Sequence, residues 1–185
     1  MKLQVLKRAA DRKGETNHLR RSGYIPAIVY HQGRPSENIA VEATAFQAVM
    51  RGVLPGRLST TRFTLVEGGK ERQVVVKEIQ YHVATYEVLH LDFEELHENA
   101  KINIKVPIEC TGTMDCVGIR LGGALRQVIR YLLVNGFPKD LPEVLELDVR
   151  AMNLHDSKRL SELQIPAGVK PLMNLNEVAV VMVKR

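Results

Sequence analysis

His90 and Asp92 are the first side chains whose types and spacing could carry chemistry. They lie in the segment 89–93, where apolar and polar residues alternate, so a strand would present both of them on one face. A histidine and a carboxylate on one face could bind a metal ion, act as a catalytic dyad or form an oriented hydrogen-bonded pair. A metal site needs a further ligand, and neither His82 nor His97 has a regular spacing to this pair. The residues alone leave these alternatives open, with a hydrogen-bonded surface pair as the simplest.

A second group of candidate residues is basic and lies near the N-terminus. Residues 1–34 hold 8 Lys and Arg against 2 Asp and Glu, whereas residues 94–185 hold 12 of each. The basic side chains are interleaved with hydrogen-bonding and aromatic ones: Lys7, Arg8, Arg12, Lys13, Asn17, His18, Arg20, Arg21, Tyr24 and Tyr30. Clustered positive charge neutralises phosphates and releases counterions, so the pattern favours a site for nucleic acid or another acidic surface. A solvated basic loop is the alternative.

No other motif suggests catalysis or a cofactor. Cys110 and Cys116 form no CxxC pair and have no histidine at zinc-finger spacing. The glycine-rich segment 118–123 lacks the residue order of a phosphate-binding loop and is expected to be a turn between strands. No signature of a catalytic nucleophile is present. We therefore expect no catalytic residue, no bound metal and no cofactor.

The elements that must position these residues are mostly strands, because apolar residues recur at every second position. Strands are expected at 25–30, 60–66, 72–79, 88–93, 101–109, 144–149 and 178–183, the last of them fully buried. The second and third of these flank Gly68 and Gly69, which predicts a tight hairpin.

Helical periodicity is clear in one segment only. Four apolar residues at i, i+3, i+4 and i+7 form one helix face: Phe46, Val49, Met50 and Val53. Thr44 and Gln47 have the spacing of a capping box at its start, and Gly52 ends it. A second, shorter helix is expected at 17–21, with Thr16 or Asn17 as its cap.

The segment 93–100 is acidic, poor in apolar residues, and marks where the net charge falls to zero. We place a domain boundary there and expect two mainly β domains with little helix, 1–93 and 94–185. The composition, 45% hydrophobic and 25% charged, is that of a soluble globular protein. No apolar run is long enough to cross a bilayer, and the first residues do not look like a signal peptide. With only two cysteines, the reducing cytoplasm is the expected compartment.

Several motifs in this sequence resemble those of the bacterial large-subunit ribosomal proteins that bind 5S rRNA. The segment 20–30 reads Arg-Arg-Ser-Gly-Tyr-Ile-Pro-Ala-Ile-Val-Tyr and is similar to a strand motif of that family. Further similar motifs follow in the family's order at 77–80, 89–93, 106–107 with 118–125, 137–148 and 157–168. The resemblance covers nearly the whole chain and is closest to the long, two-domain form, also called general stress protein Ctc.

This resemblance implies an N-terminal β-barrel with one or two short helices that binds 5S rRNA, followed by a second β-rich domain with little helix. Positions that contact RNA in the family correspond here to Arg8, Lys13, Asn17, His18, Arg20, Arg21, Tyr30, Gln80, His90 and Asp92. Asn17 and His18 stand where the family often has serine or arginine, and His31 stands where it usually has glycine. The implied partners are 5S rRNA and the large ribosomal subunit, with no membrane, and a monomer is expected off the ribosome.

Physical reasoning agrees with this implied function. An A-form helix is read through its minor groove, its irregular pairs, its 2′-hydroxyls and its phosphates. The basic residues of 1–34 would contact phosphates, and Gln80, His90 and Asp92 would discriminate through hydrogen bonds. Two other hypotheses stay open: a small metal-dependent hydrolase that uses His90 and Asp92, and a stress-linked module whose second domain docks another protein.

Overall fold

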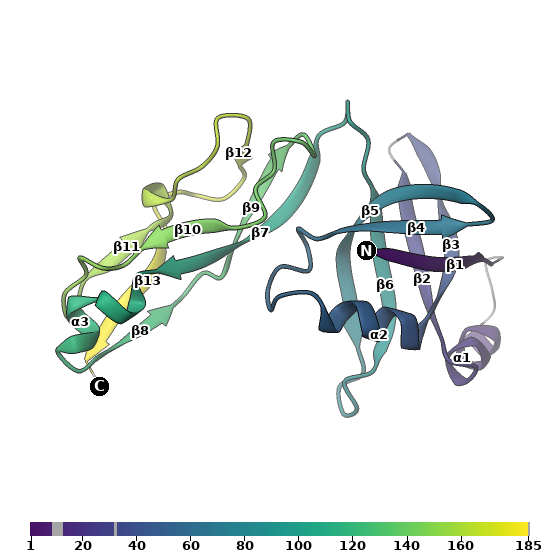
Figure 1. The fold of residues 1–185 in the computed structure, drawn as a ribbon, viewed down its shortest axis with the longest axis horizontal. Coiled ribbons are helices and arrows are strands. Elements are labelled where there is room, and N and C mark those ends of the chain that lie inside the picture. Colours follow the sequence, from purple (N-terminus) through teal and green to yellow (C-terminus); the bar gives the residue numbers. More distant parts are fainter. Residues whose placement is uncertain (9–12, 32, 185) are drawn as a thin grey trace. The chain divides into compact units, whose positions relative to one another are not determined.

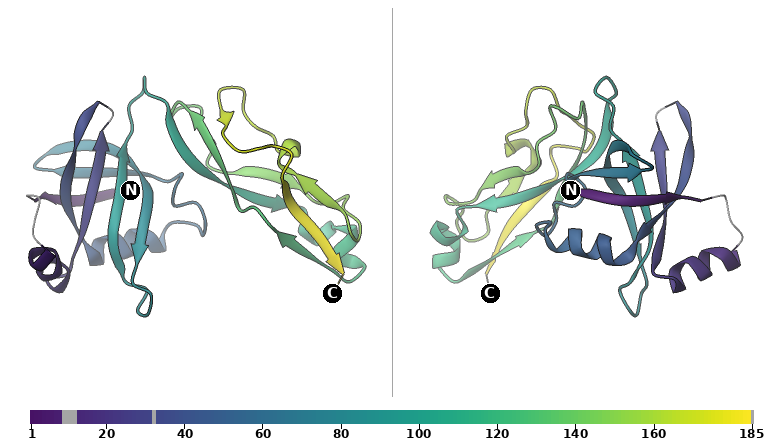
Figure 2. Two further views of the ribbon diagram at one scale, coloured as in Figure 1. Left: turned by 180° about the vertical axis from the view of Figure 1, so that it is seen from behind. Right: turned by 45° about the vertical axis from the view of Figure 1, so that its right-hand side comes forward.

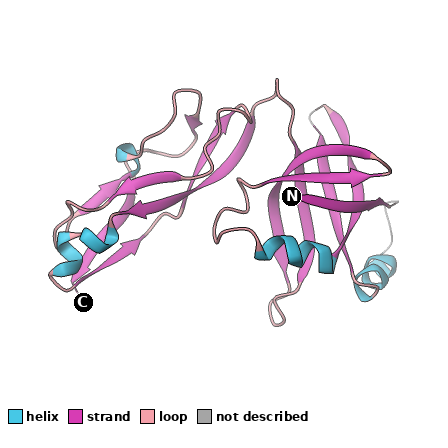
Figure 3. Cartoon of the chain, in the orientation of Figure 1, coloured by secondary structure: helices cyan, strands magenta, loops and turns pink. Residues whose placement is uncertain are grey.

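The computed structural model describes residues 1–8, 13–31 and 33–184 (Figure 1). The chain divides into two compact units, Met1–Ala100 and Lys101–Arg185. Strands dominate both units and helices are few and short (Figure 3), which confirms the predicted fold class. Among the described residues, none of the helices is long and apolar enough to span a membrane.

Six strands of the first unit close into a barrel in the order β1-β3-β2-β6-β5-β4. The strands are β1 (Lys2–Lys7), β2 (Tyr24–His31), β3 (Arg34–Glu42), β4 (Arg62–Glu67), β5 (Lys70–Tyr81) and β6 (Val88–Glu95). The β1–β4 and β2–β6 pairs are parallel and the other pairs are antiparallel. Closure pairs every strand on both sides, so the barrel has no free edge. Two further views show β5 and β6 side by side (Figure 2).

Alternate residues of each strand point inward and form the apolar core of the barrel. On β6, for example, Leu91 and Phe93 are fully buried while the residues between them face outward. The helix α2 (Ala43–Arg51) adds Phe46, also fully buried, and packs Val49 and Met50 against the same core, as does Val53 just after the helix. The expected helix is therefore confirmed.

The expected capping box of α2 is wrong. The helix begins two residues earlier than predicted, and Glu42 instead of Thr44 occupies the N-cap, without a side-chain capping bond. The Thr44 hydroxyl donates to the Glu42 carboxylate instead of to the helix backbone. The spacing of Thr44 and Gln47 was typical of a cap, but the strand β3 runs directly into the helix and takes that position.

The helix α1 (Lys13–Arg21) is longer than expected and begins before both predicted caps, so Thr16 and Asn17 lie inside it. After the helix, Gly23 adopts a left-handed φ of 83°. Its N–H donates to the carbonyl of Arg20 at 3.1 Å, and its own carbonyl accepts from Ala43 at 2.9 Å. Through these two bonds Gly23 fixes the end of α1 to the start of β2. Glycine suits this position because, without a Cβ, it adopts a left-handed φ at no steric cost.

Replacing Gly23 with alanine should lower the free energy of unfolding of the barrel by about 1 kcal/mol, because an L-residue is strained at this φ. Urea unfolding followed by circular dichroism measures the change. Gly14→Ala is the matched control: Gly14 lies within α1, its added Cβ would meet nothing within 4 Å, and alanine favours helix there. A Gly23→Ala midpoint no lower than that of Gly14→Ala would contradict the assignment.

The hairpin between β4 and β5 is confirmed as the glycine turn that the sequence predicts. Gly68 and Gly69 have φ angles of 52° and 88°, the pair of positive values that a two-residue type I′ turn requires. The turn sets the β4–β5 register, in which Glu67 lies opposite Lys70.

The second unit contains a four-stranded sheet in the order β10-β7-β9-β12 and a three-stranded sheet in the order β11-β13-β8. Its strands are β7 (Ile102–Thr111), β8 (Gly123–Gln127), β9 (Tyr131–Gly136), β10 (Leu145–Asp148), β11 (Ser157–Arg159), β12 (Lys170–Pro171) and β13 (Val178–Lys184). Single helical turns occur at η1 (Thr113–Asp115), α3 (Val117–Arg120) and η2 (Leu160–Glu162). Two local expectations are corrected here. In the segment 118–123, residues 118–120 belong to the short helix α3, residues 121–122 form a turn and Gly123 begins β8. The strand β13 is not fully buried, because Val183 is 42% exposed.

Candidate nucleic-acid interface

A chain of hydrogen bonds links Tyr30, Asp92 and His90 on the outer face of β2 and β6. The Tyr30 hydroxyl donates to Asp92 Oδ2 at 2.9 Å, and His90 Nδ1 lies 2.7 Å from Asp92 Oδ1. Parallel pairing places Ile28 beside Asp92, so Tyr30, two residues further along β2, reaches the same carboxylate. Both oxygens of Asp92 are thus engaged, and the carboxylate orients the tyrosine and the histidine together.

Gln80 extends this group onto a third strand. Antiparallel pairing of β5 and β6 sets Gln80 directly opposite His90, and its side chain is exposed. Neighbouring strands lie roughly 4.8 Å apart, so all four polar side chains are within reach of one bound molecule. We call Tyr30, Gln80, His90 and Asp92 the outer-face row.

Partial burial shapes the electrostatics of the outer-face row. The side chains of His90 and Asp92 are each 18% exposed, whereas Tyr30 is 41% exposed. The pKa of Tyr30 is raised above its ordinary value of 10.0, first by the hydrogen bond to Asp92, then by burial and by the charges of Asp92 and Glu78. The neutral phenol, which donates that bond, is therefore the favoured form.

Asp92→Ala should lower the pKa of Tyr30 toward the ordinary value, because the acceptor that stabilises the neutral phenol is lost. Titration of the tyrosine ring carbons by NMR measures the change. In the wild type, the bond stabilises the fold fully below the unfolded pKa near 10, and this contribution disappears as the pH rises through the raised folded pKa. The NMR signals of the second unit should be the same in both proteins, which controls for a general disturbance of the fold. If the pKa of Tyr30 is the same in Asp92→Ala as in the wild type, Asp92 does not accept the hydrogen bond of Tyr30 in solution.

Arg20 joins α1 to the outer-face row. Its Nε donates to the carbonyl of Leu89 at 3.1 Å, and its Nη1 donates to Asn17 Oδ1 at 3.2 Å. Leu89 precedes His90, so the guanidinium lies at the edge of the row. His18 and Arg21 are exposed on the same helix. The structure therefore brings a basic helix next to a face of hydrogen-bonding groups.

Four of the basic candidates lie apart from the row or outside the described residues, the first being Lys7 at the end of β1. Arg8 sits at the junction of β1 and β3, where its backbone N–H donates to the carbonyl of Asn38 and its Nε donates to the carbonyl of Ile39, each at 3.1 Å. The strand β3 separates β1 from β2, so Arg8 is peripheral to the row. Arg12 is outside the described residues, and of Lys13 only its position at the start of α1 is described.

Acidic side chains flank the outer-face row, and the sequence analysis did not single them out. Glu78 lies opposite Asp92, and Glu94, one further outward position along β6, pairs with Lys77. Carboxylates repel phosphates, so this face is suited to groups that donate hydrogen bonds, such as 2′-hydroxyls and base amino groups. The basic side chains of α1 lie next to this face, where Arg20 contacts Leu89.

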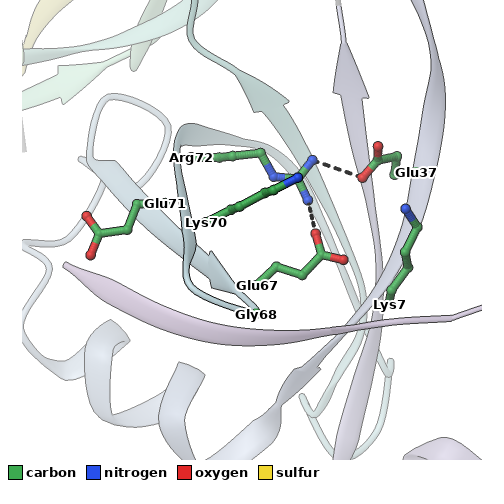
Figure 4. A pocket seen from close by; sticks show the side chains of 7 residues that line it. All are labelled: Lys7, Glu37, Glu67, Gly68, Lys70, Glu71 and Arg72. Carbon is green, nitrogen blue, oxygen red and sulfur yellow. Dashed lines mark hydrogen bonds and ion pairs between the residues drawn. The ribbon is translucent and has the colours of Figure 1, made fainter.

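One end of the barrel carries a second polar feature. On each of the six strands, the residue that continues the inward series beyond the apolar core is charged or titratable: Lys7, His31, Glu37, Glu67, Arg72 and Glu95. Arg72 donates to Glu37 at 2.9 Å and to Glu67, and these three side chains line an open pocket of about 660 Å³ (Figure 4). The hydrogen bond from Arg72 is the main cause that lowers the pKa of Glu37. We call these six residues the barrel-end layer.

The comparisons with known proteins decide the family. The sequence model of the ribosomal L25p family matches residues 3–93, and that of the C-terminal domain of ribosomal protein TL5 matches residues 101–185. The chain belongs to the ribosomal L25p family. Relatives named large ribosomal subunit protein bL25 are 45% identical in Chlamydia muridarum and 46% identical in Chlamydia abortus, each over 185 residues and the full length of both chains. The resemblance seen in the sequence, including the long two-domain form, is confirmed.

The outer-face row and α1 lie entirely within the residues that the L25p model matches. The match ends at Phe93, while β6 continues to Glu95 and the N–H of Leu96 donates to the carbonyl of Gln73 at 2.8 Å. The barrel of this L25p protein therefore includes the first residues of the expected linker.

Proposed function

We propose that this protein binds 5S rRNA through the outer-face row and α1, as a structural and non-catalytic component of the large ribosomal subunit in the cytoplasm. Off the ribosome the protein would be a monomer. No cofactor would be needed for its binding of RNA. The observation that carries the proposal is the Tyr30–Asp92–His90 chain, held rigidly on adjacent strands beside a basic helix. The names of its relatives place them in the large ribosomal subunit.

The two parts of this interface would have different roles. The basic residues of α1, together with the other basic residues of 1–34, would supply the attraction to phosphates, which is strong but insensitive to sequence. The outer-face row offers a phenol, an imidazole, an amide and a carboxylate, a set that can match 2′-hydroxyls and the edges of irregular base pairs. A rigid barrel fixes these groups in advance, so little conformational freedom is lost on binding.

The metal-dependent hydrolase is less well supported than RNA binding. Both Asp92 oxygens already bind neighbouring side chains, and nothing in the described parts of the chain adds a third ligand to the His90–Asp92 pair. The geometry of the pair is that of a histidine ring whose orientation is held by a carboxylate.

The affinity of the full-length protein for 5S rRNA should fall steeply with salt. If roughly five phosphates are neutralised, the logarithm of the association constant should change with the logarithm of salt concentration with a slope on the order of −4. Fluorescence anisotropy with labelled 5S rRNA measures this slope, and a plain A-form RNA duplex of equal length is the control. A flat dependence, or equal affinity for the duplex, would overturn the proposal.

Arg20→Ala should weaken binding of 5S rRNA by at least ~1 kcal/mol and reduce the salt slope by about 1, because it removes one phosphate-binding charge. Arg51→Ala is the matched control, since it removes an exposed arginine at the end of α2. Arg20→Lys should keep most of the salt slope while losing the hydrogen bonds of the guanidinium. If Arg20→Ala and Arg51→Ala bind equally well, Arg20 is not at the interface.

A further inference from the structure

Two histidines and a glutamate converge at the barrel-end layer, away from the outer-face row. His31 ends β2, Glu95 ends β6, and His97 follows two residues later. One ligand atom from each of the three lies within 4.8 Å of the others. Parallel pairing of Tyr30 with Glu94 carries the next residues of the two strands, His31 and Glu95, side by side. The backbone of the barrel thus brings His31 next to two residues that lie more than 60 positions further along the chain.

His31 is the unusual member of the cluster. Its side chain is only 5% exposed, and within the described part of the chain neither ring nitrogen makes a hydrogen bond of normal geometry. Nδ1 touches the Glu95 carboxylate, and Nε2 faces Glu37 Oε1 at 3.8 Å. Buried ring nitrogens in folded proteins are usually hydrogen-bonded, whereas among the described residues Nδ1 of His31 has the Glu95 carboxylate beside it and Nε2 has no hydrogen-bond partner.

We propose that His31, Glu95 and His97 bind a divalent transition-metal ion, with zinc as the best match. Two imidazoles and one carboxylate form a common three-ligand set for Zn²⁺, which leaves a fourth position for water or a further ligand. Zinc–ligand distances of about 2.0–2.2 Å place tetrahedral ligand atoms roughly 3.3 Å apart. The His31–Glu95 contact would widen to this separation. His97 is 45% exposed and lies 3.9 Å from Glu95, so its side chain has room to move inward.

The surroundings of the cluster suit a cation. Glu37 faces the second nitrogen of His31, as the carboxylate behind a metal-bound histidine commonly does. Arg72 holds Glu37 in place through its 2.9 Å hydrogen bond (Figure 4). The barrel-end layer contains three glutamates against one lysine and one arginine, so it is net negative when His31 is neutral.

The competing explanation is an ion pair between a protonated His31 and Glu95. In that arrangement His97 adds only a weak, exposed pair with Glu95 at 3.9 Å, and no metal is needed to stabilise the cluster. The two explanations therefore differ in what His97 does, and His97 is exposed enough to be replaced without disturbing the core.

The test is a titration of chelator-treated, full-length protein with ZnCl₂ by isothermal calorimetry, with CoCl₂ as a spectroscopic probe. We expect one ion per chain, a visible cobalt spectrum typical of nitrogen and oxygen ligands, and a higher Tm in the presence of zinc. His97→Gln and Glu95→Gln should each weaken zinc binding at least ~10-fold. His82→Gln is the matched control, because His82 is an exposed histidine of the same unit whose ring Nδ1 accepts a hydrogen bond from the backbone N–H of Thr85.

Three results would overturn the metal site. They are no zinc uptake by the wild type, equal affinity in wild type and His97→Gln, and a loss in His82→Gln as large as that in His97→Gln. Circular dichroism of each variant without metal confirms that it is folded. Because His97 lies outside the core, this variant keeps the test decisive even where a His31 variant fails to fold. The 5S rRNA affinity of His97→Gln is measured separately, so a failed metal site leaves the proposed function untouched.

Discussion

Asp92→Ala should weaken the binding of 5S rRNA by about 1.5–3 kcal/mol, roughly 10- to 150-fold, although it removes a negative charge from a face proposed to meet RNA. Electrostatics alone would make the variant bind more tightly, because one source of repulsion is gone. We expect the opposite since Asp92 holds both Tyr30 and His90 through hydrogen bonds of 2.9 and 2.7 Å. Without it, both side chains lose the orientation that recognition needs.

The salt dependence separates this effect from the loss of a phosphate contact. Asp92 touches no phosphate in the proposed interface, so the slope measured for Asp92→Ala should equal that of the wild type. Glu71→Ala is the matched control: it removes one carboxylate from the same barrel, where Glu71 is exposed and paired with Lys2. We expect Glu71→Ala to bind RNA as well as the wild type or slightly better. An Asp92→Ala variant that behaves like Glu71→Ala would remove Asp92 from the interface.

Local patterns were sufficient to predict much of the barrel. The glycine pair between β4 and β5 and the apolar face of α2 each depend on residues close in the sequence, and both are confirmed. The same holds for the alternation in β6, which placed His90 and Asp92 on one face. Such features are local because side-chain direction follows from a period of 2 or 3.6.

Two strands of the barrel were not predicted because their patterns are short. Only Leu3 and Val5 alternate clearly in β1, and in β3 the apolar residues Ile39 and Val41 follow a polar start with Pro35. These strands are defined by their partners in the closed barrel. Closure depends on pairings between distant segments, which no window of the sequence contains.

The candidate site likewise has one part that local sequence predicts and another that depends on the pairing of distant strands. The shared face of His90 and Asp92 follows from spacing, but the third member, Tyr30, comes from a strand 62 residues away. Parallel register between β2 and β6 determines which tyrosine reaches the carboxylate. The contact between His31 and Glu95 depends on the same register, so spacing in the sequence could not reveal it. The RNA contacts of Tyr30, His90 and Asp92 stay predictions.

Phe46→Ala should lower the stability of the barrel by about 3–5 kcal/mol, the usual cost of removing a fully buried phenylalanine. Phe46 is the one fully buried side chain of α2, and its ring meets the core formed by the six strands. Most small domains are stable by only about 5–15 kcal/mol, so the barrel of this variant should open far more often.

Hydrogen exchange of the full chain, read by mass spectrometry, measures this effect in each unit separately. Barrel amides that exchange only through global opening should exchange at least ~100-fold faster in Phe46→Ala. Amides of the second unit should be unchanged, because that unit buries its own core around Val106, Leu132 and Leu147. Gln47→Ala, at the exposed neighbouring position, controls for any change in the helix itself. If hydrogen exchange were accelerated equally in both units, the two units would unfold together. The division at Ala100 would then separate two compact units that are not independently stable.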